Sequence, residues 1–391
     1  MAVAKLVRNR HPRVAGGHPW VYRTEVEEIA GDYRPGDIVD VVDSRNRFLG
    51  RGYINPASQI LIRLLTRDPS EKIDRDFFTR RIRAAIDYRA RVVRDTDAYR
   101  LVFAEADFLP ALIVDRFGDY LSVQTLALGM DLQKETLVEI LDGLLQPSGI
   151  YERNDVAVRE LEGLPLQTGF LKGPFNPLVE IHENGLTFLV DLAGGQKTGY
   201  FLDQRENRMA LRGLAREARV LDCFCHTGTF SMYAAFYGAR EVHGIDIAST
   251  ALAVAEENAR RNGFGEVCLF REGNAFDELR ALEKAGVKYD LVILDPPAFT
   301  KSKQALAGAV RGYKEINLRA MKLLPPGGFL VTCSCSFHMK EALFIEVILD
   351  AARDAGRQLR LVELRRQAKD HPMLLASPET HYLKCAVLQV W

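Results

Sequence analysis

The sequence lacks several features that would assign it to a particular class of protein. Basic and acidic residues are equal at 52 each, so no overall positive charge indicates nucleic acid, and any such surface must be local. The six cysteines lack the spacing of a small disulfide scaffold, which favours a reducing, cytoplasmic compartment. No apolar run has transmembrane length, and the first residues lack the apolar core of a signal peptide, so export is not expected.

Apolar residues, by contrast, make up 47% of the 391 residues, enough for the cores of two or three domains. Residues 1–70 have short apolar runs separated by glycines, which predicts a small β domain. Residues 71–190 mix helical and strand patterns and predict a central α+β domain. Residues 191–391 alternate strand and helix, which is typical of a doubly wound parallel sheet. The expected fold class is therefore α/β, with a β domain in front.

The stretch from Arg219 to Ser231, RVLDCFCHTGTFS, predicts a buried strand, a tight turn and a helix. In open α/β sheets, ligands bind at the carboxyl ends of the strands, beside a helix N-terminus. The G-x-G-x-x-G pattern of dinucleotide sites is missing, because Phe224 and His226 stand where glycines are needed and only Gly228 remains. A smaller, cationic cofactor of nucleoside type fits better. On this stretch alone, a strand-turn-helix unit without a ligand is the alternative.

Polar side chains end four successive predicted strands: Asp222, Asp246, Asn274 and Asp295. A carboxylate at the second strand end, Asp246, can accept hydrogen bonds from both ribose hydroxyls, and Asn274 can pair with the adenine edge. Asp222 is placed to meet an ammonium group of the cofactor. Each acid taken singly is more often a helix N-cap, but the ordered set indicates a nucleoside cofactor.

The opening of the chain is locally basic. Trp20 and Tyr22 are interleaved with the basic residues that precede the first acidic one: Lys5, Arg8, Arg10, Arg13 and Arg23. Basic side chains with aromatic rings suit phosphate contact and base stacking, so this opening is a candidate RNA surface. An ordinary solvated edge with Trp20 packed in the core is the alternative that charge leaves open.

Two groups of motifs resemble a known family. HPWVY (18–22), GDIV (36–39), FLGRG (48–52) and NPAS (55–58) resemble the PUA domain, an RNA-binding pseudobarrel. The motifs LDCFCHTGTFS, GIDI, GNAF and LDPPAF resemble the S-adenosylmethionine fold of class I methyltransferases. With QKTGYFLDQR, which in the family forms a flap over the cofactor and the target base, they cover nearly the whole chain. The chain thus resembles the PUA-containing 23S ribosomal RNA cytosine-5 methyltransferases. On composition alone, a turn and a helix start capped by Asp203 is the alternative for residues 194–205.

The resemblance implies S-adenosylmethionine as cofactor and large-subunit ribosomal RNA as substrate, with no membrane partner and with a homodimer as one possible assembly. The implied cofactor-binding residues are Asp222, Phe224, Thr227, Gly228, Asp246, Asn274, Ala275, Asp295, Gln204 and Tyr200. The candidate RNA-binding residues are Lys5, Arg8, Arg10, Arg13, Trp20, Lys197, Arg205, Phe299 and Lys301. Asn274 stands where many relatives carry aspartate, and an amide can still pair with adenine.

The predicted fifth strand, GFLVTCSCS, carries the candidate nucleophile. Alternation along a strand puts Cys333 and Cys335 on the same face, with Cys335 nearer the carboxyl end. Carbon 5 of a pyrimidine becomes nucleophilic only after a group such as a thiolate has added to carbon 6. The resemblance places that nucleophile at Cys335 and lets Asp295 hold the cytosine ring. The thiol needs a neighbour that favours its ionisation, for which His338 and Lys301 are candidates by proximity in sequence.

Several alternatives stay open at this point. An LDPPAF motif also suits methylation of exocyclic amino groups, as in a ribosomal RNA guanine-N2 or adenine-N6 methyltransferase, which needs no nucleophile. A cysteine on an apolar strand is more often an inert core residue. A non-catalytic RNA-binding protein with a relic cofactor fold belongs to another class. A metal site is not expected, because the C-x-C pairs lack zinc spacing and the fourth strand separates the first from the fifth.

Overall fold

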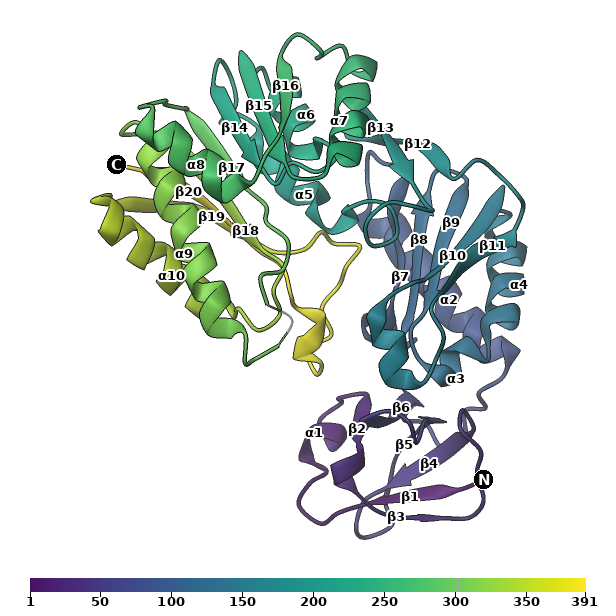
Figure 1. The fold of residues 1–391 in the computed structure, drawn as a ribbon. Helices are drawn as coiled ribbons and strands as arrows, with labels where there is room; N and C mark the ends of the chain where they lie inside the picture. Colours follow the sequence, from purple (N-terminus) through teal and green to yellow (C-terminus); the bar gives the residue numbers. More distant parts are fainter. Residues whose placement is uncertain (301) are drawn as a thin grey trace. The chain divides into compact units, whose positions relative to one another are not determined.

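The computed structural model describes residues 1–300 and 302–391, which form two compact units (Figure 1). The first unit comprises Met1–Ile181, Val190–Leu202 and Lys369–Thr380. The second unit comprises His182–Leu189, Asp203–Ala368 and His381–Trp391. None of the described helices combines the length and the apolar character that crossing a bilayer requires.

The N-terminal part of the first unit is a six-stranded sheet in the order β2-β6-β5-β4-β1-β3. Its elements are β1 (Val3–Leu6), α1 (Pro12–Ala15), β2 (Trp20–Tyr22), β3 (Val26–Ala30), β4 (Ile38–Val42), β5 (Phe48–Ile54) and β6 (Ile60–Thr66). Strands β1 and β4 are parallel, and the other neighbours are antiparallel. Alternate residues such as Val39 and Val41 on β4 point into one core with Leu6 and Ile62. The expected small β domain is confirmed.

The rest of the first unit is built on a five-stranded sheet in the order β11-β10-β9-β8-β7, followed in the chain by a two-stranded hairpin. Its elements are α2 (Arg75–Val92), β7 (Ala98–Phe103), β8 (Leu112–Phe117), β9 (Tyr120–Thr125), α3 (Leu128–Asp131), α4 (Lys134–Leu145), β10 (Gly149–Asn154) and β11 (Gln167–Lys172). The hairpin is β12 (Leu178–Glu183) with β13 (Leu186–Asp191), and its central residues, His182–Leu189, belong to the second unit. Asn184 and Gly185 turn the hairpin with φ of 51° and 85°, the left-handed pair that a tight hairpin turn requires.

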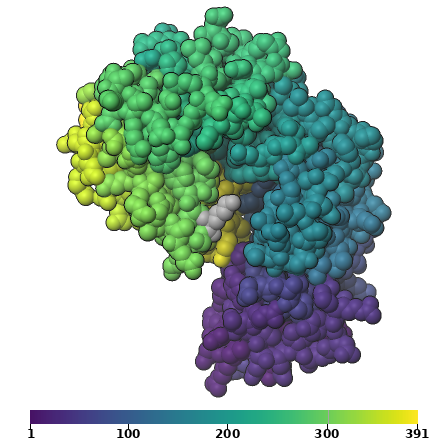
Figure 2. Space-filling model, in the orientation of Figure 1, coloured from purple at the N-terminus to yellow at the C-terminus, as the bar shows by residue number. Residues whose placement is uncertain are grey.

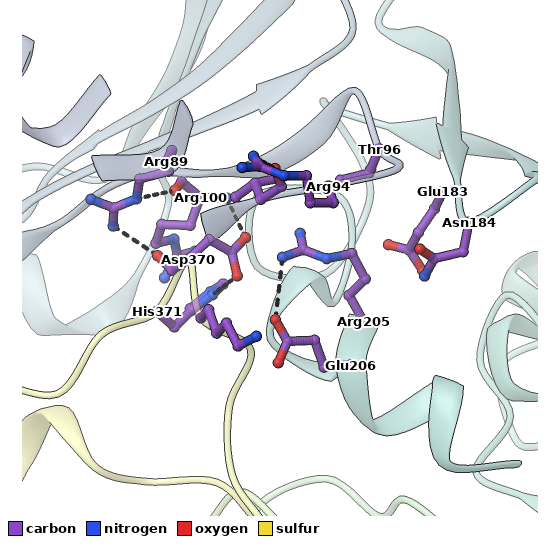
Figure 3. Close-up of polar contacts among 12 residues, drawn as sticks. Arg89, Arg94, Thr96, Arg100, Glu183, Asn184, Arg205, Glu206, Asp370 and His371 are labelled. Carbon is purple, nitrogen blue, oxygen red and sulfur yellow. Dashed lines mark hydrogen bonds and ion pairs between the residues drawn. The ribbon is translucent and has the colours of Figure 1, made fainter. Parts of the chain in front are cut away.

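Helix α2 begins where Asp74 accepts a hydrogen bond from the backbone N–H of Phe77, at 3.0 Å. The helix is rich in arginine, yet Arg89 is fully buried and donates to the backbone carbonyl of Asp370 at 2.7 Å. Figure 3 shows this contact, together with the Asp370 carboxylate, which accepts from the backbone N–H of Arg100 at 2.9 Å. Arg89 therefore holds the segment Lys369–Thr380 in the first unit.

The second unit is a seven-stranded sheet in the order β16-β15-β14-β17-β18-β20-β19. Its strands are β14 (Arg219–Cys223), β15 (Glu241–Asp246), β16 (Cys268–Glu272), β17 (Leu291–Leu294), β18 (Phe329–Ser334), β19 (Leu359–Arg365) and β20 (Lys384–Val390). Its helices are α5 (Arg205–Arg208), α6 (Thr229–Phe236), α7 (Ser249–Arg261), α8 (Ala275–Lys284), α9 (Leu306–Leu323) and α10 (Glu341–Ala355). Strands β14 to β18 are parallel, and β20 runs antiparallel between β18 and β19. The doubly wound sheet that the sequence predicts is confirmed.

The register of the parallel strands brings their carboxyl ends to one edge. Cys223 on β14 pairs with Ile245 on β15 and with Leu294 on β17, which in turn pairs with Thr332 on β18. Helices α8, α9 and α10 pack side by side against this sheet through a shared apolar core (Figure 1). In the space-filling view, residues coloured from teal-green through green to yellow form the visible surface of this unit (Figure 2). Any ligand site of the sheet therefore lies at the edge where the strands end.

Candidate active site

The turn after β14 is built from residues in a left-handed conformation. Phe224, His226 and Gly228 have φ of 63°, 49° and 73°. A Cβ added at Gly228 would lie 2.9 Å from Phe270 Cζ and 3.0 Å from Ala255 Cβ, so both the conformation and the space call for glycine. Helix α6 starts directly afterwards, so its free backbone N–H groups lie at the end of β14.

Asp222 is fully buried at the end of β14. Its Oδ2 accepts a hydrogen bond from Ser231 Oγ at 2.7 Å, while its Oδ1 is buried without a hydrogen-bond partner among the described residues. Burial, together with the charges of Asp295 and Asp246, raises the pKa of this carboxyl to about 7, against the hydrogen bond from Ser231, which lowers it. A carboxylate with a spare oxygen in such surroundings suits a cationic group of a ligand.

Asp246 and Asn274 follow the next two strands. The Asp246 carboxylate accepts from the backbone N–H of His226 at 2.8 Å and from that of Ala248 at 2.9 Å, which fixes its orientation beside the turn. Asn274 caps α8 by accepting from the N–H of Phe276 at 3.0 Å. Asn274 thus takes the N-cap role that is the alternative for such residues, and its amide group can still serve a ligand.

Aromatic rings pack next to these strand ends. Phe224 contacts Phe276 and Phe299, with ring centroids 6.4 Å and 6.3 Å apart, and Phe299 lies 4.6 Å from Tyr313. Phe224, Phe276 and Phe299 are all partly exposed. They offer apolar faces against which planar ring systems can pack.

Asp295 directly follows β17, and the side chain of Gln204 fixes the orientation of its carboxylate. Gln204 Nε2 donates to Asp295 Oδ1 at 2.8 Å, and Gln204 Oε1 accepts from Asn207 Nδ2 at 2.6 Å. Since the second bond fixes which end of the amide faces Asp295, the carboxylate is oriented by a chain of two side chains.

The two cysteines of β18 differ in their surroundings. Cys333 is fully buried, and its hydrogen bond with Cys385 and its burial raise its pKa well above the usual value, so it is a protonated core thiol. Cys335 follows the last residue of β18 and is partly exposed, whereas the other five cysteines are buried. Its sulfur lies 3.9 Å from the carbonyl oxygen of Pro296 in the LDPPAF loop.

A set of polar side chains that the sequence did not single out surrounds Cys335. Ser334 Oγ and Ser336 Oγ lie 3.0 Å and 3.1 Å from Tyr313 Oη. Lys384, at the start of β20, donates from Nζ to the backbone carbonyls of Ser336 and Tyr382, both at 2.7 Å. In the sequence, Lys384 is the last residue of the segment PETHYLK (378–384), but only the pairing of β18 with β20 shows where it lies.

The remaining predicted site residues are divided between the two units. Tyr200 is buried and Lys197 is exposed, with its Nζ 4.7 Å from the ring centroid of Phe201, and all three belong to the first unit. Arg205 is buried in the second unit, 3.9 Å from Glu206 (Figure 3). Thr227 accepts a hydrogen bond at its backbone carbonyl, and Ala275 is the first, buried residue of α8. Both lie in the second unit, as do all predicted cofactor-binding residues except Tyr200. Lys301 lies outside the described residues.

The basic opening is largely paired within the first unit. Arg13 lies 2.8 Å from Glu25 and Lys5 lies 3.5 Å from Glu28. Arg10 donates to a backbone carbonyl, Arg8 is exposed, and Trp20 Nε1 donates to Glu105 at 2.9 Å. Neighbouring carboxylates therefore offset part of the positive charge that the sequence shows here.

Comparison with known proteins defines the class. A model of the S-adenosylmethionine-dependent methyltransferases matches residues 152–378, and a model of the PUA-like domain matches residues 4–67. A solved structure described as a methyltransferase complexed with SAH aligns over 100% of both chains with a TM-score of 0.86 and 20% identity. A methyltransferase from Streptococcus mutans aligns over 100% of both chains with a TM-score of 0.84 and 20% identity. The fold is that of a class I methyltransferase.

Curated relatives match at higher identity. They carry the name Ribosomal RNA large subunit methyltransferase I, and the one from Shewanella amazonensis is 45% identical over 99% of both chains. That from Aeromonas salmonicida is 43% identical over 98% of both chains. The chain belongs to the family of S-adenosylmethionine-dependent methyltransferases that includes these proteins. It is an enzyme, and its cofactor is S-adenosylmethionine, whose ammonium group fits the spare oxygen of Asp222.

Proposed function

We propose that this methyltransferase forms 5-methylcytosine in large-subunit ribosomal RNA through a covalent bond between Cys335 and carbon 6 of the target cytosine. The observation that carries the proposal is the position of Cys335. Its thiol is the partly exposed one of six, follows β18, and lies against the carbonyl of Pro296 in the loop after β17. The names of the curated relatives support ribosomal RNA as substrate.

The second unit supplies the cofactor contacts of the proposal. Asp222 holds the ammonium group, Asp246 the ribose hydroxyls and Asn274 the adenine edge, with Ala275 beside it. The turn formed by Phe224, Thr227 and Gly228 approaches the methionine part, and Gln204 and Asp295 complete the set within this unit. When bound, the cofactor supplies a methyl group on a positively charged sulfur.

The protein's own groups carry the remaining chemistry. The Cys335 thiolate adds to carbon 6 of the cytosine, and the electron pair of the carbon 5–carbon 6 double bond makes carbon 5 nucleophilic. Asp295 holds the ring, oriented by the hydrogen bond from Gln204. After carbon 5 has taken the methyl group, a base removes the carbon 5 proton. The carbon 6–sulfur bond then breaks, which releases the thiolate and restores the ring.

RNA docking belongs to the PUA-like segment in this proposal. Residues 1–70 hold the RNA, residues 71–190 form the connecting domain, and residues 191–391 carry the chemistry. Arg8 and Lys197 are the first candidates for phosphate contact, because their side chains are exposed to solvent. The partly exposed ring of Phe299 is a candidate for stacking on the target base. A ribosomal substrate also favours action in the cytoplasm, and a homodimer is one assembly to test.

Methylation of an exocyclic amino group is the competing chemistry, and the LDPPAF loop suits it. The thiol of Cys335 beside that loop favours cytosine-5 chemistry, because amino methylation needs no nucleophile. The alternative of a non-catalytic RNA-binding protein with a relic fold is excluded, because the chain belongs to a family of S-adenosylmethionine-dependent methyltransferases.

The experiment uses the full-length enzyme, the cofactor and large-subunit ribosomal RNA transcribed with 5-fluorocytidine. Fluorine at carbon 5 blocks proton removal, so the covalent complex accumulates. We expect a protein–RNA adduct with the native enzyme and with Cys333→Ala, and none with Cys335→Ala. Full methylation activity of Cys335→Ala on unmodified RNA would exclude the thiol mechanism.

A further inference from the structure

Lys384 places an ammonium group inside the second unit next to the end of β18. It pairs with Ser334 in the antiparallel ladder, and only 3% of its surface is exposed. Both of its hydrogen bonds go to neutral backbone carbonyls, those of Ser336 and Tyr382, at 2.7 Å each. In its protonated form, a buried ammonium group that donates only to carbonyls has no hydrogen-bonded carboxylate to offset its charge, which therefore acts on any titratable group close by.

Cys335 is such a group. Among the neighbouring charges, the thiolate form of Cys335 raises the pKa of Lys384 the most. Burial has the larger, opposite effect, so the pKa of Lys384 is lowered to about 8. The amine is therefore mainly protonated at neutral pH. The hydrogen bond from Nζ to the carbonyl of Ser336 also fixes the residue that directly follows Cys335.

Four other titratable groups act on this pair. His381 interacts electrostatically with Lys384, and burial lowers its pKa below the usual value, so its imidazole is mainly neutral at neutral pH. Tyr313 on α9 interacts electrostatically with Cys335, but burial raises its pKa to about 12, so it is neutral here. Lys340 and Glu341, at the start of α10, act on Lys384 with opposite signs. Lys340 is exposed, and its charge is therefore screened by water. Lys384 is thus the buried cation of the group.

We infer that Lys384 is a positioning residue that keeps a positive charge beside Cys335 and so favours the thiolate form of the nucleophile. The proton that leaves the sulfur passes to solvent, and Lys384 keeps its own. This inference rests on the proposed role of Cys335 as nucleophile. It assigns to Lys384 the activating role for which His338 and Lys301 were the candidates from sequence.

The test measures thiol ionisation directly, without RNA. Full-length protein is alkylated with iodoacetamide from pH 5.5 to 10, and the peptide containing Cys335 is quantified by mass spectrometry. The other five cysteines are buried and react slowly in the folded protein. In the native protein we expect the reactivity of Cys335 to rise with a midpoint clearly below the free-thiol value of about 8.5. A midpoint at or above that value overturns the inference, and no variant is needed for this result.

Variants then separate charge from structure. In Lys384→Met we expect the midpoint to move up by about one pH unit, with about tenfold slower alkylation at pH 7. Lys384→Arg keeps the charge and should restore most of the reactivity. Lys340→Met removes an exposed positive charge nearby and serves as the matched control, with little change expected. An unchanged midpoint in folded Lys384→Met, checked by its thermal melting curve, also overturns the inference.

The alkylation and trapping experiments fail independently. A low midpoint that depends on Lys384, without an adduct on 5-fluorocytidine RNA, would refute the proposed function and leave the charge effect standing. An adduct at Cys335 together with a midpoint insensitive to Lys384 would refute only this inference.

Discussion

Binding of the cofactor should depend on pH through Asp222. Its pKa is about 7 in the ligand-free protein, because of burial first and then the charges of Asp295 and Asp246. Only the ionised carboxylate attracts an ammonium group. The ionised fraction rises from roughly one tenth at pH 6 to about three quarters at pH 7.5, so affinity should rise nearly tenfold, or ~1.2 kcal/mol.

Isothermal titration calorimetry of S-adenosylhomocysteine tests this expectation. Measurements at pH 6 in two buffers with different ionisation enthalpies should show release of about 0.9 proton per site, because the bound ammonium group forces Asp222 to ionise. Asp222→Asn should weaken binding by about 2 kcal/mol and remove both the pH dependence and the proton release. Asp290→Asn removes a carboxylate before β17, at the opposite end of the same sheet, and should change neither.

Asp222→Asn should stabilise the ligand-free protein. An acid whose pKa is raised on folding binds more protons folded than unfolded, so stability falls as pH rises from about 4 to about 7. Above pH 7 the buried charge is destabilising, and Asp222→Asn should raise the free energy of unfolding by about 1–3 kcal/mol. Persistent pH dependence of binding in Asp222→Asn, or a less stable ligand-free variant at pH 8, would refute the reasoning.

Two further substitutions follow from single contacts. Gly228→Ala adds a Cβ at a φ of 73°, within 3.0 Å of neighbouring side chains, and should lower the free energy of unfolding by about 1–3 kcal/mol, measured by urea denaturation; a variant as stable as the native protein contradicts the close packing. Gln204→Ala removes the hydrogen bond to Asp295 and should lower kcat about tenfold at saturating cofactor. An unchanged kcat would show that catalysis does not depend on the orientation that Gln204 gives to Asp295.

The cofactor end of the site could be predicted because it follows from local order. Each parallel strand runs into its helix, so an acid that ends a strand must lie at the common edge of the sheet. Asp222, Asp246 and Asp295 were placed in this way, and the structure brings them together in the second unit. The unequal burial of Cys333 and Cys335 also follows from where β18 ends.

The surroundings of the thiol could not be predicted, because they depend on a pairing between distant segments. Lys384 reaches Ser336 only because β20 runs antiparallel to β18 in a register that no local pattern fixes. The ion pairs of the basic opening could not be predicted for the same reason. Arg13 and Lys5 read as free charges in sequence, and folding brings Glu25 and Glu28 beside them.

The central claim is the formation of 5-methylcytosine in ribosomal RNA, and nucleoside analysis tests it most directly. Large-subunit ribosomal RNA is incubated with the enzyme and isotopically labelled S-adenosylmethionine, digested to nucleosides and separated by chromatography with mass detection. The account predicts that the label appears in 5-methylcytidine with the native enzyme and is absent with Cys335→Ala. Label in N2-methylguanosine or N6-methyladenosine, with Cys335→Ala still active, would contradict it.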